Sequence, residues 1–253
     1  MMLLMSMGAA AHVASTHDAL RQWTSARGCT FGPVEIAVSS LGGGIGMFAT
    51  ANIDAGDVLF CVPRRLNIGL SAALSDADCG AEFKDAVLDG GAMSVLCTFI
   101  AKQYLCADSD MSPYLVTLPE LSPTTCDQVQ HWLSDEVEVL KGTAAYAQAV
   151  QIRQEAKEAV EFALRLPSLR ERVQRAMSGA SSPRDTDDLI AEAVRGAHAA
   201  VLCRSFSLED DDPGARELIP LLDTLQHREP SSIDYRHGEL RQRTECRHSS
   251  RAR

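Results

Sequence analysis

Residues 41–68, LGGGIGMFATANIDAGDVLFCVPRRLNI, decide the fold, because a glycine-rich segment there is followed by extended apolar segments. The run from 58 to 62 is continuously apolar and is closed by Pro63, which predicts a buried strand. Gly56 lies at the tight position of the turn before it. Residues 31–38 alternate apolar and polar side chains and predict a further strand. The chain therefore begins with a β-rich part.

The segment from Gly44 to Ala49 also satisfies the pattern G-x-G-x-x-[G/A] of dinucleotide-binding proteins. That pattern binds pyrophosphate only where a helix begins directly after the loop. Here a turn and a strand follow, so the sequence does not favour a dinucleotide site. Closely spaced glycines can let the backbone approach a ligand, or can form a hairpin that binds nothing. The motif alone leaves both interpretations open.

Beyond residue 90 the apolar residues recur at helical spacing. Asp185 or Thr186 is placed to cap the last of these helices. The order of strands, then a long helical part, then a short strand predicts the α+β class. The expected helices cover 17–26, 93–105, 128–141, 146–166 and 185–206, and the late strand covers 218–222.

The composition is that of a globular protein, with 45% apolar residues in a chain of 253. The 34 acidic and 24 basic residues give a net charge of −10, which disfavours nucleic acid and favours basic partners. Residues 228–253 differ, because seven arginines and four acids give them a net charge of +3. They contain few apolar residues, so we expect a disordered basic tail there and a disordered leader over 1–16.

The eight cysteines form no C-x-x-C pair, and cysteines and histidines do not cluster at metal-ligand spacing. We therefore expect reduced cysteines, no metal and an intracellular protein, with cytoplasm, nucleus and plastid left open. No apolar run is long enough to predict a membrane span.

Five segments of the chain, taken together, carry more information than any one of them. In chain order they are GGGIGMFATANIDAGDVLFCVPRRLNI, PYLVTLPE, LKGT, CRSFSLEDD and LIPLLDTLQH. In this order and spacing they resemble SET-domain methyltransferases of the RuBisCO large-subunit lysine methyltransferase subgroup, over roughly 17–227. The resemblance implies a SET-domain β-fold of small sheets split by a long helical insert. We expect the N-terminal β part at 31–68, the insert at about 90–205 and an incomplete C-terminal part at 206–227.

The resemblance implies methyl transfer from S-adenosylmethionine to a lysine side chain of a protein substrate, without a metal. It places Arg204 near substrate as well as cofactor, and Asp223 beside the channel for the lysine. Arg204 could instead satisfy carbonyls at a helix end, Asp223 could cap a turn, and His227 could simply be exposed. The implied cofactor-binding residues are Gly43, Gly44, Ile45, Gly46, Arg204, Gln226 and His227.

Two departures from the family pattern bear on activity. Gln226 stands where the family has Asn, and the family's catalytic Tyr would lie beyond the end of the chain. Tyr235 is too close to His227 and has no expected strand around it, so we assign no catalytic residue. Two hypotheses follow. The protein is a lysine methyltransferase impaired by truncation, or it is a non-catalytic SET-like remnant that binds cofactor or a protein.

Overall fold

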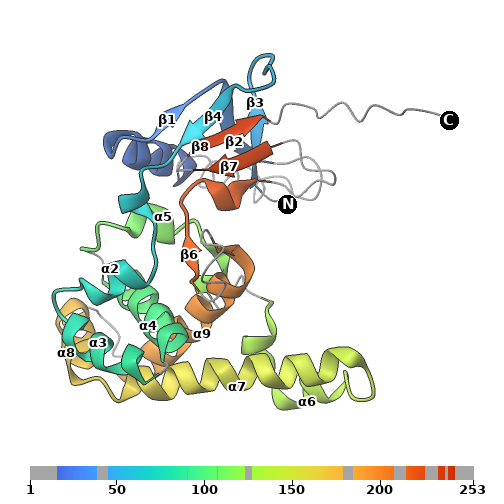
Figure 1. The fold of residues 1–253 in the computed structure, drawn as a ribbon. Coiled ribbons are helices and arrows are strands. Elements are labelled where there is room, and N and C mark those ends of the chain that lie inside the picture. Colours follow the sequence, from blue (N-terminus) through green and yellow to red (C-terminus); the bar gives the residue numbers. More distant parts are fainter. Residues whose placement is uncertain are drawn as a thin grey trace, which may run out of the picture. The chain divides into compact units, whose positions relative to one another are not determined.

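A computed structural model describes most of the chain, which divides into two compact units (Figure 1). Unit 1 combines residues 1–66 with 219–253, and unit 2 runs from Asn67 to Leu218. Unit 2 is thus an insertion into unit 1, wider than the insert of 90–205 that the sequence predicts. The described residues are 16–38, 45–89, 91–106, 108–122, 127–178, 185–207, 215–225, 233–236 and 239–242.

Unit 1 contains the predicted first helix, over residues 16–26, whose Leu20 and Trp23 are buried. Its largest sheet has four antiparallel strands in the order β1-β4-β8-β7. A separate hairpin pairs β2 with β3, the strand that follows the glycine segment. The bounds are β1 Thr30–Phe31, β2 Val34–Val38, β3 Ile45–Ala49, β4 Val58–Cys61, η1 Arg64–Leu66, η4 Leu222–Thr224, β7 Ile233–Arg236 and β8 Glu239–Gln242.

Because β3 is a strand, the glycine segment is not followed by the helix that a dinucleotide site requires. The turn before β4 is also as predicted, since Gly56 adopts a φ of +98°, which glycine enters without a Cβ clash. The expected strand over 31–38 is divided in two. Gly32 separates β1 from β2, and a Cβ on it would lie 2.4 Å from the carbonyl oxygen of Val58.

The expectation of a disordered tail over 228–253 is wrong where the structure describes this segment. Residues 233–236 and 239–242 form β7 and β8, and β8 lies between β7 and β4. Phe60 of β4 is paired with Leu240, so the sheet joins strands from the two ends of the sequence. Tyr235 therefore does lie in a strand, paired with Leu240.

Composition misled the prediction because a strand between two others is held by backbone hydrogen bonds on both sides. Such pairing does not require a fully apolar segment. The sequence did carry a signal, since Ile233 and Tyr235 alternate with Asp234 and Arg236 as in a half-buried strand. Arg236 of β7 is paired with Glu239 of β8, so the two strands are neighbours in the sequence as well as in the sheet.

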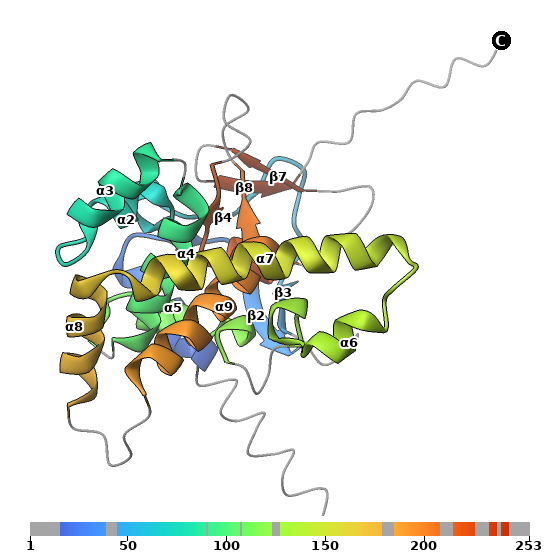
Figure 2. The same cartoon turned by 90° about the horizontal axis from the view of Figure 1, so that it is seen from below.

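Unit 2 is helical, and its centre is formed by α4, α7 and α9, which all contact one another (Figure 2). All three were predicted, and the Asp185 side chain caps α9 by accepting from the Asp187 N–H at 2.9 Å. The bounds are α2 Leu70–Leu74, α3 Gly80–Leu88, α4 Ala92–Leu105, α5 Ser112–Leu115, η2 Pro119–Leu121, η3 Val129–His131, α6 Ser134–Glu138, α7 Ala144–Leu164, α8 Pro167–Met177, α9 Thr186–Arg204, β5 Ser205–Phe206 and β6 Glu217–Leu218.

Two predicted elements of unit 2 are wrong in extent. The helix expected at 128–141 is instead η3 followed by the short α6, because the Glu136 carboxylate accepts from the Leu133 N–H at 2.6 Å and starts a new helix there. The strand expected at 218–222 is only the two-residue β6. Pro220 has no N–H to donate to a strand pairing.

A buried ionic cluster joins the segment between α2 and α3 to α4 and α8. Lys102 Nζ lies 2.6 Å from Asp76 Oδ1 and 2.6 Å from Asp78 Oδ2, and the Lys102 side chain is 5% exposed. Burial acts to lower the pKa of Lys102, but the hydrogen bonds and charges of both aspartates outweigh it and the pKa is raised. Arg172 on α8 extends the cluster to Asp78 and Asp108.

Candidate functional site

The strand that follows the glycine segment and the late segment around Asp223 come together in unit 1. Here β3 contacts η4, although the two are separated in sequence by the whole of unit 2. Gly46 is buried on β3 and is paired with Ala37. Ile45, which is paired with Val38, is the first residue of the strand. The structure thus brings β3, which carries the expected cofactor residues Ile45 and Gly46, into contact with η4, which carries Asp223, the residue expected beside the substrate lysine.

The backbone just before Asp223 is strained. Leu221 is fully buried and has a φ of 76° and a ψ of −37°, a conformation that costs a branched residue on the order of 1–3 kcal/mol. Its carbonyl oxygen accepts from the Thr224 N–H at 3.1 Å and from Thr224 Oγ1 at 2.6 Å, which closes the turn. Such strain often occurs at functional sites. No sequence pattern singles out Leu221.

Asp223 lies inside η4 and is partly buried. It is therefore not the N-cap residue that the sequence offered as an alternative, since that position belongs to Leu221. Four predicted site residues lie outside the described residues, namely Gly43, Gly44, Gln226 and His227. Gly43 and Gly44 precede β3 in the chain, and Gln226 and His227 follow η4 closely.

Arg204 belongs to unit 2, where it is the last residue of α9. Its Nε donates to both carboxylate oxygens of Glu120, each at 2.8 Å. Glu120 lies in η2, and its side chain is only 9% exposed. Arg204 is thus held by a nearly buried carboxylate, a role that neither sequence interpretation of it included. Removing either partner would leave the other charge poorly solvated.

Gly196 makes this ion pair possible. A Cβ at this position would lie 2.6 Å from the Glu120 carbonyl oxygen and 2.9 Å from the Leu121 Cα, closer than atoms can approach. Only glycine therefore lets η2 lie against α9 at this height. Gly196 stands two helical turns before Arg204, on the same side of α9. Glu120 ends the segment PYLVTLPE, but nothing in the sequence links it to Arg204.

The two ends of unit 2 are fastened to each other beside this ion pair. Ile68 and Leu218 exchange two backbone hydrogen bonds of 2.9 Å. Asn67 Nδ2 donates to Glu217 Oε2 at 2.7 Å, and Gly69 leaves room for the Glu217 side chain. Strand β5, directly after Arg204, is paired with β6. The first and last residues of unit 2 thus form one short, hydrogen-bonded stem.

The cysteines do not form a nucleophile or metal site in the part of the chain that the structure describes. All six cysteines there are free thiols. Burial raises the pKa of Cys29 to about 11 and the pKa of Cys97 to about 12, so both are protonated at neutral pH. Over the same residues, no group of three metal-binding side chains occurs, and no helix is long and apolar enough to cross a membrane.

No protein-family model matches the sequence, and neither does any curated protein. Several solved structures do match the fold. The SET domain of LSMT bound to MeLysine and AdoHcy is 18% identical with a TM-score of 0.64, over 90% of this chain and 49% of that chain.

The SET domain of LSMT bound to lysine and AdoHcy is 16% identical, with a TM-score of 0.60, over 90% of this chain and 50% of that chain. Rubisco LSMT bound to AdoMet is 17% identical, with a TM-score of 0.61, over 90% of this chain and 52% of that one. The present chain spans about half the length of these structures. Small antiparallel sheets interrupted by a helical insertion, together with these matches, show that the chain has a SET-domain fold.

Proposed function

We propose that the protein is an S-adenosylmethionine-dependent protein-lysine N-methyltransferase. The observation that carries this proposal is the contact of β3, which carries Ile45 and Gly46, with η4, which carries Asp223. The fold supports it, because solved structures with that fold hold lysine, AdoHcy or AdoMet.

The residues around β3 fit a cofactor with a polar amino-acid end. A buried glycine such as Gly46 lets backbone N–H and C=O groups lie close to a ligand, because no side chain intervenes. We assign the cofactor contacts to Gly43, Gly44, Ile45 and Gly46, and to Gln226 and His227 after η4. S-adenosylmethionine supplies an activated methyl group that a neutral amine can take up by in-line displacement. The protein's part is then to position and desolvate the amine.

Asp223 is proposed to orient the substrate amine. Its carboxylate can accept a hydrogen bond from the lysine nitrogen as the substrate binds. The turn at Leu221 fixes the position of Asp223, because the strained backbone is closed by two hydrogen bonds from Thr224. We also retain Arg204 as a cofactor- and substrate-contacting residue by resemblance. Glu120 would then act as a positioning residue that fixes the Arg204 side chain.

The charge of unit 2 agrees with a lysine-bearing substrate. Its 25 acidic and 13 basic residues give it a net charge of −12, whereas the rest of the chain has a net charge of +2. Such a field raises the rate at which a basic protein approaches and slows the approach of nucleic acid. We therefore expect the methylated protein to be basic around its target lysine.

The test has two stages. Titration calorimetry with S-adenosylmethionine measures cofactor binding, and a tritiated methyl donor incubated with cell lysate measures transfer to protein. Asp223→Asn should leave cofactor binding intact and lower transfer about tenfold or more, the expected loss for one charge-assisted hydrogen bond. Asp54→Asn, in an exposed turn of the same unit, is the matched control and should change neither quantity.

A second candidate is favoured by Gln226, which is one methylene longer than the family's Asn and would shift an amide that normally lies inside the core. In that case the protein binds cofactor, or a protein, without transferring methyl. Cofactor binding without detectable transfer would establish this candidate. Failure of the folded protein to bind cofactor would overturn both the methyltransferase proposal and the assigned cofactor residues.

A further inference from the structure

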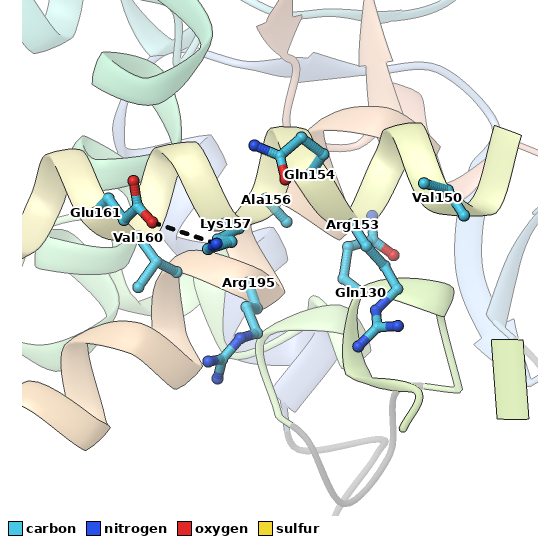
Figure 3. A pocket seen from close by; sticks show the side chains of 9 residues that line it. All are labelled: Gln130, Val150, Arg153, Gln154, Ala156, Lys157, Val160, Glu161 and Arg195. Carbon is cyan, nitrogen blue, oxygen red and sulfur yellow. Dashed lines mark ion pairs between the residues drawn. The ribbon is translucent and has the colours of Figure 1, made fainter. Parts of the chain in front are cut away.

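A pocket of about 560 Å³ lies on unit 2, away from Arg204 and Glu120 (Figure 3). Its wall is formed by α7, with contributions from α9 and η3. Arg153 and Lys157 come from α7 and Arg195 from α9, and Figure 3 shows the two guanidinium groups projecting from their helices on the same side of α7. The volume is in the range that binds small ligands or a few side chains.

The pocket is basic in a strongly acidic unit. It is lined by three basic residues and one acid, Glu161, whereas unit 2 as a whole has a net charge of −12. Glu161 lies 3.7 Å from Lys157, an exposed pair that contributes little. The basic lining is therefore opposite to the average charge of the unit.

Arg153 and Arg195 have no ion pair among the residues that the structure describes, although both are half-buried. Other arginines of unit 2 are paired, such as Arg170 with Asp187 at 2.8 Å and Arg172 with Asp78 at 3.4 Å. A partly desolvated guanidinium without an anion gives up hydration for no compensating contact. Two of them beside one pocket are poised to bind an oxyanion.

The apolar part of the lining adds a second requirement on the ligand. Val150 is 45% exposed, and Val160, which is only 7% exposed, also lines the pocket. A compact inorganic anion would leave Val150 uncovered. A peptide can place a carboxylate on the arginines and a neighbouring apolar side chain on Val150. The surrounding acidic field also disfavours nucleic acid and other polyanions.

We propose that this pocket binds a peptide segment of a partner protein that carries an isolated acidic residue, with its Glu or Asp carboxylate held between Arg153 and Arg195. Because the rest of unit 2 is acidic, the partner carries isolated acids next to apolar residues in an otherwise neutral or basic segment. The inference does not depend on methyl transfer, since it concerns binding to unit 2 alone.

The probe is a fluorescein-labelled peptide, Ala-Glu-Leu-Glu-Leu-Lys, compared with the same peptide in which both Glu are Gln. Fluorescence anisotropy with the full chain measures the two dissociation constants. The Glu peptide should bind at least about tenfold more tightly than the Gln peptide. Its affinity should fall several-fold between low and high salt, because the contact is between charges.

The variants locate the site. The double variant Arg153→Gln with Arg195→Gln should bind the Glu peptide about tenfold or more weakly, and it should have an unchanged circular dichroism spectrum because neither arginine is ion-paired in the described part. Arg175→Gln, an exposed arginine on α8, is the matched control and should bind as the parent does.

Three outcomes would overturn the inference. The first is equal binding of the Glu and Gln peptides, and the second is undiminished binding by the double variant. The third is binding of a phosphate-bearing probe, fluorescein-labelled ATP, at this pocket together with no binding of the Glu peptide. An inactive methyltransferase that still binds the Glu peptide through these two arginines would leave the inference intact and refute only the proposed function.

Discussion

Unit 1 and unit 2 of this protein are each stabilised by a different kind of internal interaction. In unit 1 the sheet is closed by pairing β4 with β8, residues from opposite ends of the sequence. In unit 2 neighbouring helices pack around α9, and charged side chains such as Lys102 join a helix to a neighbouring segment. The first unit depends on long-range backbone pairing and the second on local helices with side-chain contacts. The two should therefore respond to different substitutions.

The largest loss in the free energy of unfolding is expected for Lys102→Met. This change leaves Asp76 and Asp78 without their buried cation, and breaking a buried pair from one side costs about 3–5 kcal/mol. Urea unfolding followed by circular dichroism at 222 nm, which reports mainly the helices of unit 2, measures it. Lys84→Met, at an exposed position of α3, is the control and should cost less than about 0.5 kcal/mol. Equal stabilities of the two variants would refute a structural role for the cluster.

A proline in β8 should destabilise the sheet of unit 1. Leu240→Pro removes a backbone N–H from a strand that has partners on both sides, at a cost of about 3 kcal/mol or more. Hydrogen exchange should increase in β1, β4 and β7 and stay unchanged in α4, α7 and α9. Leu240→Ala is the comparison that keeps the N–H. If Leu240→Pro exchanged like Leu240→Ala, the pairing of β8 would not be what holds unit 1.

A smaller difference in stability is expected between variants at two adjacent buried leucines of unit 1. Leu221→Gly and Leu222→Gly remove the same side chain from positions that are 0% and 3% exposed. Glycine adopts a positive φ without a clash, so Leu221→Gly also releases backbone strain. We expect it to be less destabilising than Leu222→Gly by about 1–2 kcal/mol. Thermal unfolding gives the comparison, and the reverse order would show that Leu221 is not strained.

The smallest effect concerns pH and should be confined to unit 2. Burial lowers the pKa of His198, which is fully buried with its Nδ1 3.2 Å from Gln130 Nε2 and Glu155 close to Nε2. Unfolded His198 takes up a proton near its ordinary pKa of 6.5, but the folded protein resists that proton. Stability should therefore be greatest above that pH and decline as the pH falls below it. His198→Gln should flatten this decline in denaturant titrations at a series of pH values.

Much of unit 2 is predictable because helices are local structures. Apolar spacing in the sequence indicates where α4, α7 and α9 lie, and the aspartate before α9 marks where that helix begins. The helices α2 and α3 were not predicted, and α6 is shorter than the helix expected at 128–141. The residues of the candidate site come from the resemblance and stay a prediction, and the structure shows that β3 and η4, on which some of them lie, are in contact. The pairing of Arg204 with Glu120 was not predicted, because residues 84 positions apart show no pattern that links them.

By itself, the sequence determined the α+β class, the strand after the glycine segment and the central helices, because side-chain periodicity and turn residues act over a few positions. Only the tertiary structure decided that β8 completes the sheet and that Gly196 admits Glu120 to Arg204. It also showed that Arg153 and Arg195 line one pocket. Backbone pairing and charge pairing depend on which distant residues become neighbours, and that is settled only when the chain has folded.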